Sequence, residues 1–292
     1  MSFFEAILLG IVQGLTEFLP VSSSGHLAIC EHLLHIQMDS GMFFDVMLHM
    51  GTLIAIFVAF RKDIGRLIME AIRMVRDIFL NAKLYFHNKK TGEAKRYTRI
   101  VHSNYRRFVV LVLVATVPTA ILGYLMRGIV DMASATLLFP GLGLLVTGIL
   151  LLVVDFVPAG DRIPRDVGFI TALLIGVCQG FATFPGVSRS GTTITACLLS
   201  GFNRKFAVKF SFIMSIPAVF GAAVLELTKV GGETITAGLV GNCFAGAIAA
   251  GIVGYFCIKT MLVIVQRQKL RYFSYYCFLI GVVAIVGNFL IK

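Results

Sequence analysis

The sequence predicts an all-α integral membrane protein with six transmembrane helices and two re-entrant helical hairpins in an inverted-topology repeat. Its 292 residues are 58% hydrophobic and only 14% charged, whereas soluble domains average roughly 45–50% apolar and ~25% charged residues. Six apolar segments read as membrane spans, and one segment with a polar centre occurs twice in the chain. The composition therefore indicates that this protein folds in lipid, and the repeat shows where it departs from a simple helical bundle.

The six predicted spans are continuous apolar stretches. A helix needs about 20 mostly apolar residues to cross the hydrocarbon core of a bilayer. The stretches that fit this length lie at 43–60, 108–126, 134–154, 207–228, 236–260 and 273–291.

The duplicated segment runs from Gly10 to Gly25 and again from Gly176 to Gly191, with eight identities and no gap. Each copy lies in a region, 3–36 or 168–200, that has two short apolar arms around a centre of Pro, Gly and Ser. Neither arm is long enough to span comfortably, which predicts two re-entrant hairpins. Such backbone is tolerated at membrane depth only inside protein or beside a water-filled cavity.

The basic residues predict the orientation. Of 26 Lys and Arg residues, 13 lie in the segment 61–107, which the positive-inside bias places in the cytoplasm. The loops that then face inward hold 22 basic residues, and only Arg127, Lys229 and Lys292 face outward. Three full spans separate the hairpins, so they enter from opposite sides and their tips can meet near the midplane. A nucleic-acid role is not expected, because the basic segment lacks interleaved stacking aromatics.

The predicted organisation is one membrane domain, 1–292. It contains a first repeat of hairpin and span at 3–60, the basic cytoplasmic segment at 61–107, and a second repeat at 168–228. Within the basic segment, helical spacing of apolar residues predicts an amphipathic helix at 64–79 on the inner leaflet, and a polar loop is expected at 87–107. The six cysteines form no C-x-x-C pair, so neither a disulfide nor a cysteine metal site is expected.

The hairpin centres predict an anion site. Pro20 and Pro185 interrupt the first arms, and Ser22 and Ser188 suit the N-cap of each second arm. Two helix N-termini with unpaired N–H groups would then face each other, which favours a multiply charged phosphate. The alternative is that the hydroxyls only satisfy broken backbone. The candidate phosphate-binding residues are Ser22, Ser23, Ser24, Gly25, Ser188, Arg189, Ser190 and Gly191.

Arg189 is the most informative single residue of these. A guanidinium at membrane depth is costly and usually functional, and its planar fork suits phosphate oxygens. It can instead, or in addition, pair with Glu17. That carboxylate is a candidate metal ligand, general base or histidine partner, and it lies one helical turn after Gln13.

His26 follows the serine turn and can act as a base, an acid or a nucleophile, or as a hydrogen-bonded core residue. His49, one turn after Asp45, is weaker evidence. That pair either lines the outer mouth or satisfies its own polar groups.

Two segments of the sequence resemble the signature segments of one known family. These are Gln13-Gly-Leu-Thr-Glu-Phe-Leu-Pro-Val-Ser-Ser-Ser-Gly-His26 and Pro185-Gly-Val-Ser-Arg-Ser-Gly-Thr-Thr193. They are similar to motifs of the undecaprenyl pyrophosphate phosphatase family, also called the bacitracin resistance protein BacA family. The resemblance extends over most of the chain, although 61–107 is longer than expected for that family.

The resemblance implies a phosphatase of the bacterial plasma (inner) membrane that converts undecaprenyl pyrophosphate to undecaprenyl phosphate, the lipid carrier of peptidoglycan synthesis, and confers bacitracin resistance. It also implies a divalent cation, Mg²⁺ or Ca²⁺, and a site open to the outer (periplasmic) face. The family's motif residues fall on Gln13 and Glu17 for the cation, Ser23 for the nucleophile, and His26. Its phosphate-binding residues fall on Ser188, Arg189, Ser190 and Thr193. The family's first position is Glu where this chain has Gln13, which coordinates a cation more weakly.

Several alternatives remain open at this level. Ser23, His26 or water can attack the terminal phosphorus. A transporter or flippase of polyprenyl phosphate lipids is the rival function, because inverted repeats with broken helices also build transporters. A homodimer is compatible with the sequence.

Overall fold

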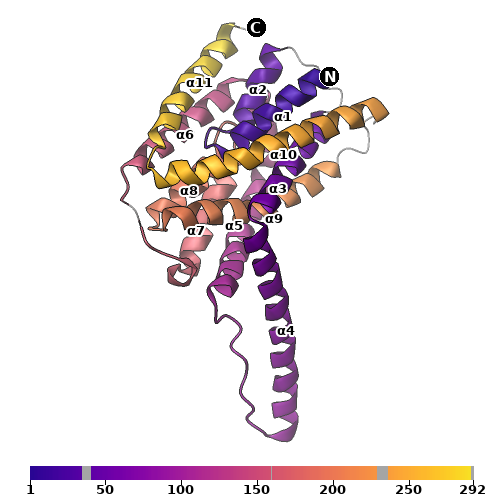
Figure 1. The fold of residues 1–292 in the computed structure, drawn as a ribbon, viewed down its shortest axis with the longest axis vertical. Coiled ribbons are helices and arrows are strands. Elements are labelled where there is room, and N and C mark those ends of the chain that lie inside the picture. Colours follow the sequence, from indigo (N-terminus) through magenta and orange to yellow (C-terminus); the bar gives the residue numbers. More distant parts are fainter. Residues whose placement is uncertain (35–40, 159, 229–235, 291–292) are drawn as a thin grey trace.

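The computed structural model describes residues 1–34, 41–158, 160–228 and 236–290, and these residues are almost entirely helical (Figure 1). Within those ranges the only β-type pairing is an isolated bridge between Arg162 and Phe202. The helices are α1 (Phe3–Phe18), α2 (Ser23–Leu33), α3 (Gly41–Ala59), α4 (Arg61–Thr91), α5 (Asn104–Ser134), α6 (Leu138–Asp155), α7 (Phe169–Phe181), α8 (Arg189–Leu199), α9 (Arg204–Leu227), α10 (Ala237–Gln266) and α11 (Arg271–Leu290), with a short 3₁₀ turn at Pro164–Asp166.

The predicted spans are confirmed as helices. Five helices, α5, α6, α9, α10 and α11, are long and apolar enough to cross a membrane, and the bent pair α3–α4 provides a sixth candidate. Each overlaps one of the predicted segments. Large apolar side chains remain exposed along them, including Leu113, Ile149, Phe220, Phe256 and Leu279. An apolar surface on every long helix is what a protein solvated by lipid requires, so the chain is a multi-pass membrane protein.

Both predicted hairpins are present as pairs of short helices, α1–α2 and α7–α8. α1 ends at Phe18, just before Pro20, and α7 ends at Phe181, before Pro185. Proline cannot continue a helix because it lacks the amide donor and its ring clashes with the preceding turn. Residues 35 and 36 of the first predicted hairpin lie outside the described residues.

The two hairpins have corresponding neighbours. α1 packs along α10, whereas α7 packs along α5, and the central pair α3 and α9 contact each other. The repeat thus extends from sequence to packing: each hairpin lies against a long helix of the other half of the chain. The opposite insertion of the two hairpins stays a prediction.

The basic segment 61–107 differs from its prediction. The helix predicted at 64–79 is longer, since α4 continues to Thr91, so the predicted loop at 87–107 is shortened to residues between α4 and α5. α4 turns 87° from α3 and projects from the helical body, with the chain returning beside it (Figure 1). Asn81 exchanges two hydrogen bonds of 2.8 Å with the backbone of Thr98, so the loop is attached along the helix. Lys229 and Lys292, assigned to the outside, fall outside the described residues.

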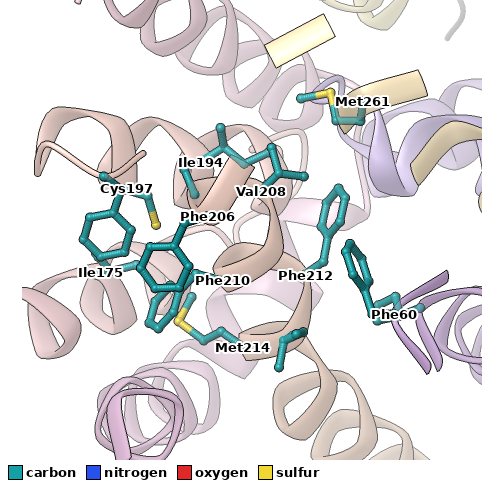
Figure 2. Close-up of a cluster of buried hydrophobic side chains, with 14 of the residues drawn as sticks. Phe60, Ile175, Ile194, Cys197, Phe206, Val208, Phe210, Phe212, Met214 and Met261 are labelled. Carbon is teal, nitrogen blue, oxygen red and sulfur yellow. The ribbon is translucent and has the colours of Figure 1, made fainter. Parts of the chain in front are cut away.

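Buried aromatic side chains of α9, together with Phe202 just before it, form a cluster (Figure 2). Phe206 stacks on Phe202 with ring centroids 5.0 Å apart, and Phe210 contacts both rings. Phe212 turns the other way, toward Phe18 of the first hairpin and Phe60 at the end of α3. Buried aromatic rings supply large contact areas with defined geometry, and the same buried cluster includes Phe18 of the first hairpin and Ile194 of the second.

Candidate active site

The tips of the two hairpins meet, as the repeat predicted. Arg189, the first residue of α8, forms an ion pair with Glu17 near the end of α1. The amide of Gly186 donates to Ser24 Oγ at 3.4 Å, and Ser190 Oγ donates to the carbonyl of Leu19 at 3.4 Å. Three polar contacts therefore join segments that are far apart in the sequence.

Glu17 is the centre of this contact. Its side chain is only 6% exposed, and both of its oxygens have partners. Oε1 accepts from Arg189, while Oε2 accepts from Ser23 Oγ at 2.6 Å and from Gln13 Nε2 at 3.1 Å. A buried carboxylate needs such compensation, because its removal from water is costly. The short bond to Ser23 also places a base beside that hydroxyl.

The second arms begin at the expected caps. Ser22 Oγ accepts from Gly25 N at 3.4 Å, and Ser188 Oγ accepts from Gly191 N at 3.1 Å. The first amides of a helix have no partner inside it. Within the described chain, the N–H groups of Ser23 and Arg189, which start α2 and α8, have no acceptor. Two helix N-termini thus offer donors at the hairpin contact, which is the arrangement that binds anions.

Arg189 has capacity left for a ligand. Its Nη1 is buried without a hydrogen-bond partner in the described structure, although its side chain is 21% exposed overall. A guanidinium can bind two groups at once through its separate amines. Arg189 can therefore hold Glu17 with one amine and a phosphate oxygen with the other.

Known proteins are similar to this chain over nearly its whole length. The sequence profile of the bacitracin resistance protein BacA matches residues 6–283. The chain belongs to the bacitracin resistance protein BacA family. It is 41% identical to an undecaprenyl-diphosphatase of Alkaliphilus metalliredigens, covering 99% of this chain and 100% of that protein. Undecaprenyl-diphosphatases of Methanosphaera stadtmanae and Methanobrevibacter smithii are 38% and 39% identical, each covering 98–99% of both chains.

His26 of this BacA-family protein is held between two partners. Its Nδ1 lies 2.7 Å from the carbonyl oxygen of Ser22, and its Nε2 lies 2.8 Å from the hydroxyl of Tyr276. A carbonyl only accepts, so Nδ1 carries the proton and Nε2 of the neutral ring accepts from Tyr276. Both nitrogens are occupied, and neither contacts Ser23 or Glu17.

The remaining predicted residues of this BacA-family protein are Gly25, Gly191 and Thr193, and only the two glycines lie at the contact between the hairpins. Gly25 and Gly191 are buried. A side chain at Gly25 would approach Gly186, and one at Gly191 would approach Pro20, so each glycine lets its helix lie against the break of the other hairpin. Thr193 lies elsewhere. It is fully buried, and its hydroxyl shares a hydrogen bond of 2.5 Å with Ser211 of α9.

Gln13 and Glu17, the predicted cation ligands, lie side by side at the hairpin contact. Among the described residues, no three His, Cys, Asp or Glu side chains converge on a common point. Gln13 Oε1, however, is buried without a partner next to Glu17. Mg²⁺ is usually held by one or two carboxylates together with phosphate oxygens and water. The donor set therefore fits a cation that arrives with a phosphate and does not form a closed protein cage.

The sequence did not predict two residues that contact the site, Thr147 and Tyr276. Thr147 of α6 accepts from the amide of Ser188 at 2.9 Å and donates to the carbonyl of Gly186 at 3.1 Å. Tyr276 of α11 binds His26. Each is a polar side chain in an otherwise apolar span, which is a weak signal for a buried polar role, and no repeat or motif distinguishes them from their neighbours.

Proposed function

We propose that this protein is an undecaprenyl-diphosphatase, which hydrolyses undecaprenyl pyrophosphate to undecaprenyl phosphate and inorganic phosphate. The observation that carries the proposal is the contact of Ser23 and Arg189 with Glu17. It brings a hydroxyl, a carboxylate base and a guanidinium suited to phosphate together at two helix N-termini. Full-length relatives with the same name support it. The polyprenyl chain would lie in the bilayer while the diphosphate occupies the hairpin contact.

The contacts favour Ser23 as the nucleophile. Ser23 Oγ would attack the terminal phosphorus and pass its proton to Glu17 Oε2, already 2.6 Å away. The new Oγ–P bond forms as the bridging P–O bond breaks, and undecaprenyl phosphate leaves. Water then attacks the phosphorus of the phosphoserine as the Oγ–P bond breaks. Glu17 returns its proton to Oγ, and the phosphate leaves with both protons of the water. His26 is disfavoured as the nucleophile because both of its nitrogens are engaged.

Arg189 and the free amides of α2 and α8 would stabilise the transferring phosphoryl group. Phosphoryl transfer is catalysed mainly by positioning and by charges placed where negative charge develops. A cation bound through Glu17 and Gln13 Oε1 would neutralise further phosphate charge. We place the protein in the cytoplasmic membrane, in the orientation that the excess of basic residues in the predicted inner loops supports. The site would open to the outer side, as the family resemblance implies.

Phosphate release from a polyprenyl diphosphate by the protein purified in detergent tests the function. Arg189→Ala is expected to lower kcat by about 10²- to 10³-fold, because it removes a charge that acts in the transition state. Arg127→Ala, at an exposed arginine stacked on Tyr124, is the matched control and should retain full rate. Detergent also separates hydrolysis from lipid transport, which needs two sealed compartments. No release by the native protein would contradict the phosphatase assignment.

The cation requirement has a separate test. A chelator should lower phosphate release, and excess Mg²⁺ or Ca²⁺ should restore it. Calorimetry without lipid substrate should show no tight binding of either ion, since the described side chains do not form a complete ligand set. Unchanged turnover in chelator would remove the cation from the mechanism.

A further inference from the structure

Tyr276 makes two contacts with His26 from a different helix. Its hydroxyl lies 2.8 Å from His26 Nε2, and the two rings stack with centroids 5.5 Å apart and planes within 8°. The hydrogen bond fixes the rotation of the imidazole, and the stacking fixes its plane. Tyr272 and Tyr275 are neighbours on α11, but their side chains are 61% and 55% exposed and bind nothing in the described structure. The contact to His26 is therefore specific to Tyr276.

His26 transmits this constraint to Ser22. Its Nδ1 donates to the Ser22 carbonyl at 2.7 Å. Ser22 has φ 67° and ψ 106°, in the left-handed half of conformational space that is unfavourable for a residue with a side chain. Such a conformation persists only where surrounding contacts enforce it. The His26 ring supplies one of those contacts, and the next residue is Ser23.

We propose that Tyr276 is a positioning residue for the phosphatase reaction, holding His26 so that the Ser22 turn keeps Ser23 Oγ on Glu17. The expected effect on the reaction rests on the proposed function, whereas the contact between Tyr276 and His26 does not. Tyr276 acts through His26 and touches neither Ser23 nor Glu17. The competing explanation is that Tyr276 only attaches α11 to α2 and contributes to general stability.

Tyr276→Phe is the primary test, because it keeps the ring and removes the hydroxyl. At 40% exposure, the residue is not part of the tightly packed interior, so the melting temperature should be nearly unchanged. Loss of a hydrogen bond that orients a metal-binding histidine costs about 10- to 100-fold in activity, and we take that range for the histidine held here. We expect a drop of that size in kcat with little change in KM, while Tyr275→Phe retains the native rate. A native kcat for Tyr276→Phe would overturn the proposal.

A double-mutant cycle separates positioning from general stability. If Tyr276 acts through His26, adding Tyr276→Phe to His26→Ala should cause no further loss of kcat. Two effects that multiply would show that Tyr276 acts independently and would overturn the proposal.

The contact itself can be measured without activity. The ¹⁵N resonance of His26 Nε2 should be that of a hydrogen-bond acceptor and should shift in Tyr276→Phe but not in Tyr275→Phe. An unchanged resonance in Tyr276→Phe overturns the proposal. This measurement also decides the matter if the His26→Ala variant turns over too slowly for the double-mutant cycle to be measured. If the native protein releases no phosphate, the proposed function fails, whereas the resonance still reports whether Tyr276 holds His26.

Discussion

At the scale of single residues, the key feature is that one buried carboxylate serves three partners. Glu17 binds Arg189, Ser23 and Gln13, so in the proposed mechanism it both orients the guanidinium and accepts the proton of the hydroxyl. Removing one member of a buried ion pair leaves an uncompensated charge, which costs more than the pair itself contributes. Variants of Glu17 or Arg189 thus change folding and catalysis together, and Ser23 is the cleaner probe of chemistry.

Ser23→Ala should lower kcat on the order of 10³-fold or more, because a covalent route without its nucleophile leaves only positioning and charge stabilisation. Phosphate release measures the rate, and a phosphoserine trapped by acid quenching should be present in native protein and missing in the variant. Ser200→Ala is the control, since that hydroxyl donates only to the Ala196 carbonyl of its own helix. A variant at position 23 with near-native rate would indicate direct attack by water.

At the scale of elements, one buried arginine of α5 joins α4 to the returning loop. Arg106 is 3% exposed and donates to Glu70 at 2.8 Å, to Asp77 at 2.7 Å and to the Ile100 carbonyl at 2.7 Å. The sequence predicted a solvated basic segment, and most of its charges are indeed exposed. The turn of 87° from α3 suits a helix on the membrane surface, where the exposed Ile72 and Phe79 would face lipid.

Acid should loosen this attachment. Hydrogen bonds from Arg106 hold the pKa of Glu70 and of Asp77 below their usual range, so their stabilising effect is present above the ordinary carboxyl pKa and is lost as pH falls through the lowered folded-state pKa. The chain has no tryptophan, so Tyr97→Trp provides a single fluorescent reporter in the loop. Its transition should occur below the ordinary range of about 4.

The same titration in an Arg106→Met background is the control. Without the guanidinium, Glu70 keeps only Arg73 and Asp77 keeps only Arg76 as a partner, so the pKa values of both carboxyls should rise toward their ordinary range and the transition should move to higher pH. Coincident transitions in the two backgrounds would contradict the role given to Arg106.

At the scale of the whole molecule, duplication makes each hairpin depend on the other half of the chain. Gly10 lies against the backbone of Gly246 in α10, and Gly176 lies against the backbone of Ala115 in α5. These equivalent glycines let the helices pack at backbone contact, which small residues allow in membrane proteins. The position of the tips thus depends on long helices on both sides of the site.

Gly10→Ala and Gly176→Ala should each lower stability, because a methyl group would overlap a backbone carbonyl that cannot move aside. Overpacking of this kind costs about 1–3 kcal/mol, which thermal melting in detergent can detect. Gly128→Ala and Gly221→Ala are matched controls within helices, with no atom near the added carbon. If Gly10→Ala and Gly176→Ala both melt at the temperature of the native protein, the close packing of these helices is contradicted.

The sequence by itself determined the membrane class, the six spans and the two hairpins. Those features follow from local quantities: the length of apolar runs, the interruption at Pro20 and Pro185, and the caps at Ser22 and Ser188. The repeat also indicated that the tips meet, and the cost of a lone arginine at membrane depth pointed to Arg189.

Only the tertiary structure decided which groups remain free to react. In the folded chain, Ser23 binds Glu17 and Thr193 binds Ser211 of α9. Tyr276 of the last helix binds His26. The tertiary structure also attached the predicted loop to α4 through Arg106. These contacts join residues far apart in the chain or depend on how side chains share hydrogen bonds. Hydropathy and motif spacing carry no information about either, because both describe a residue only by its neighbours in sequence.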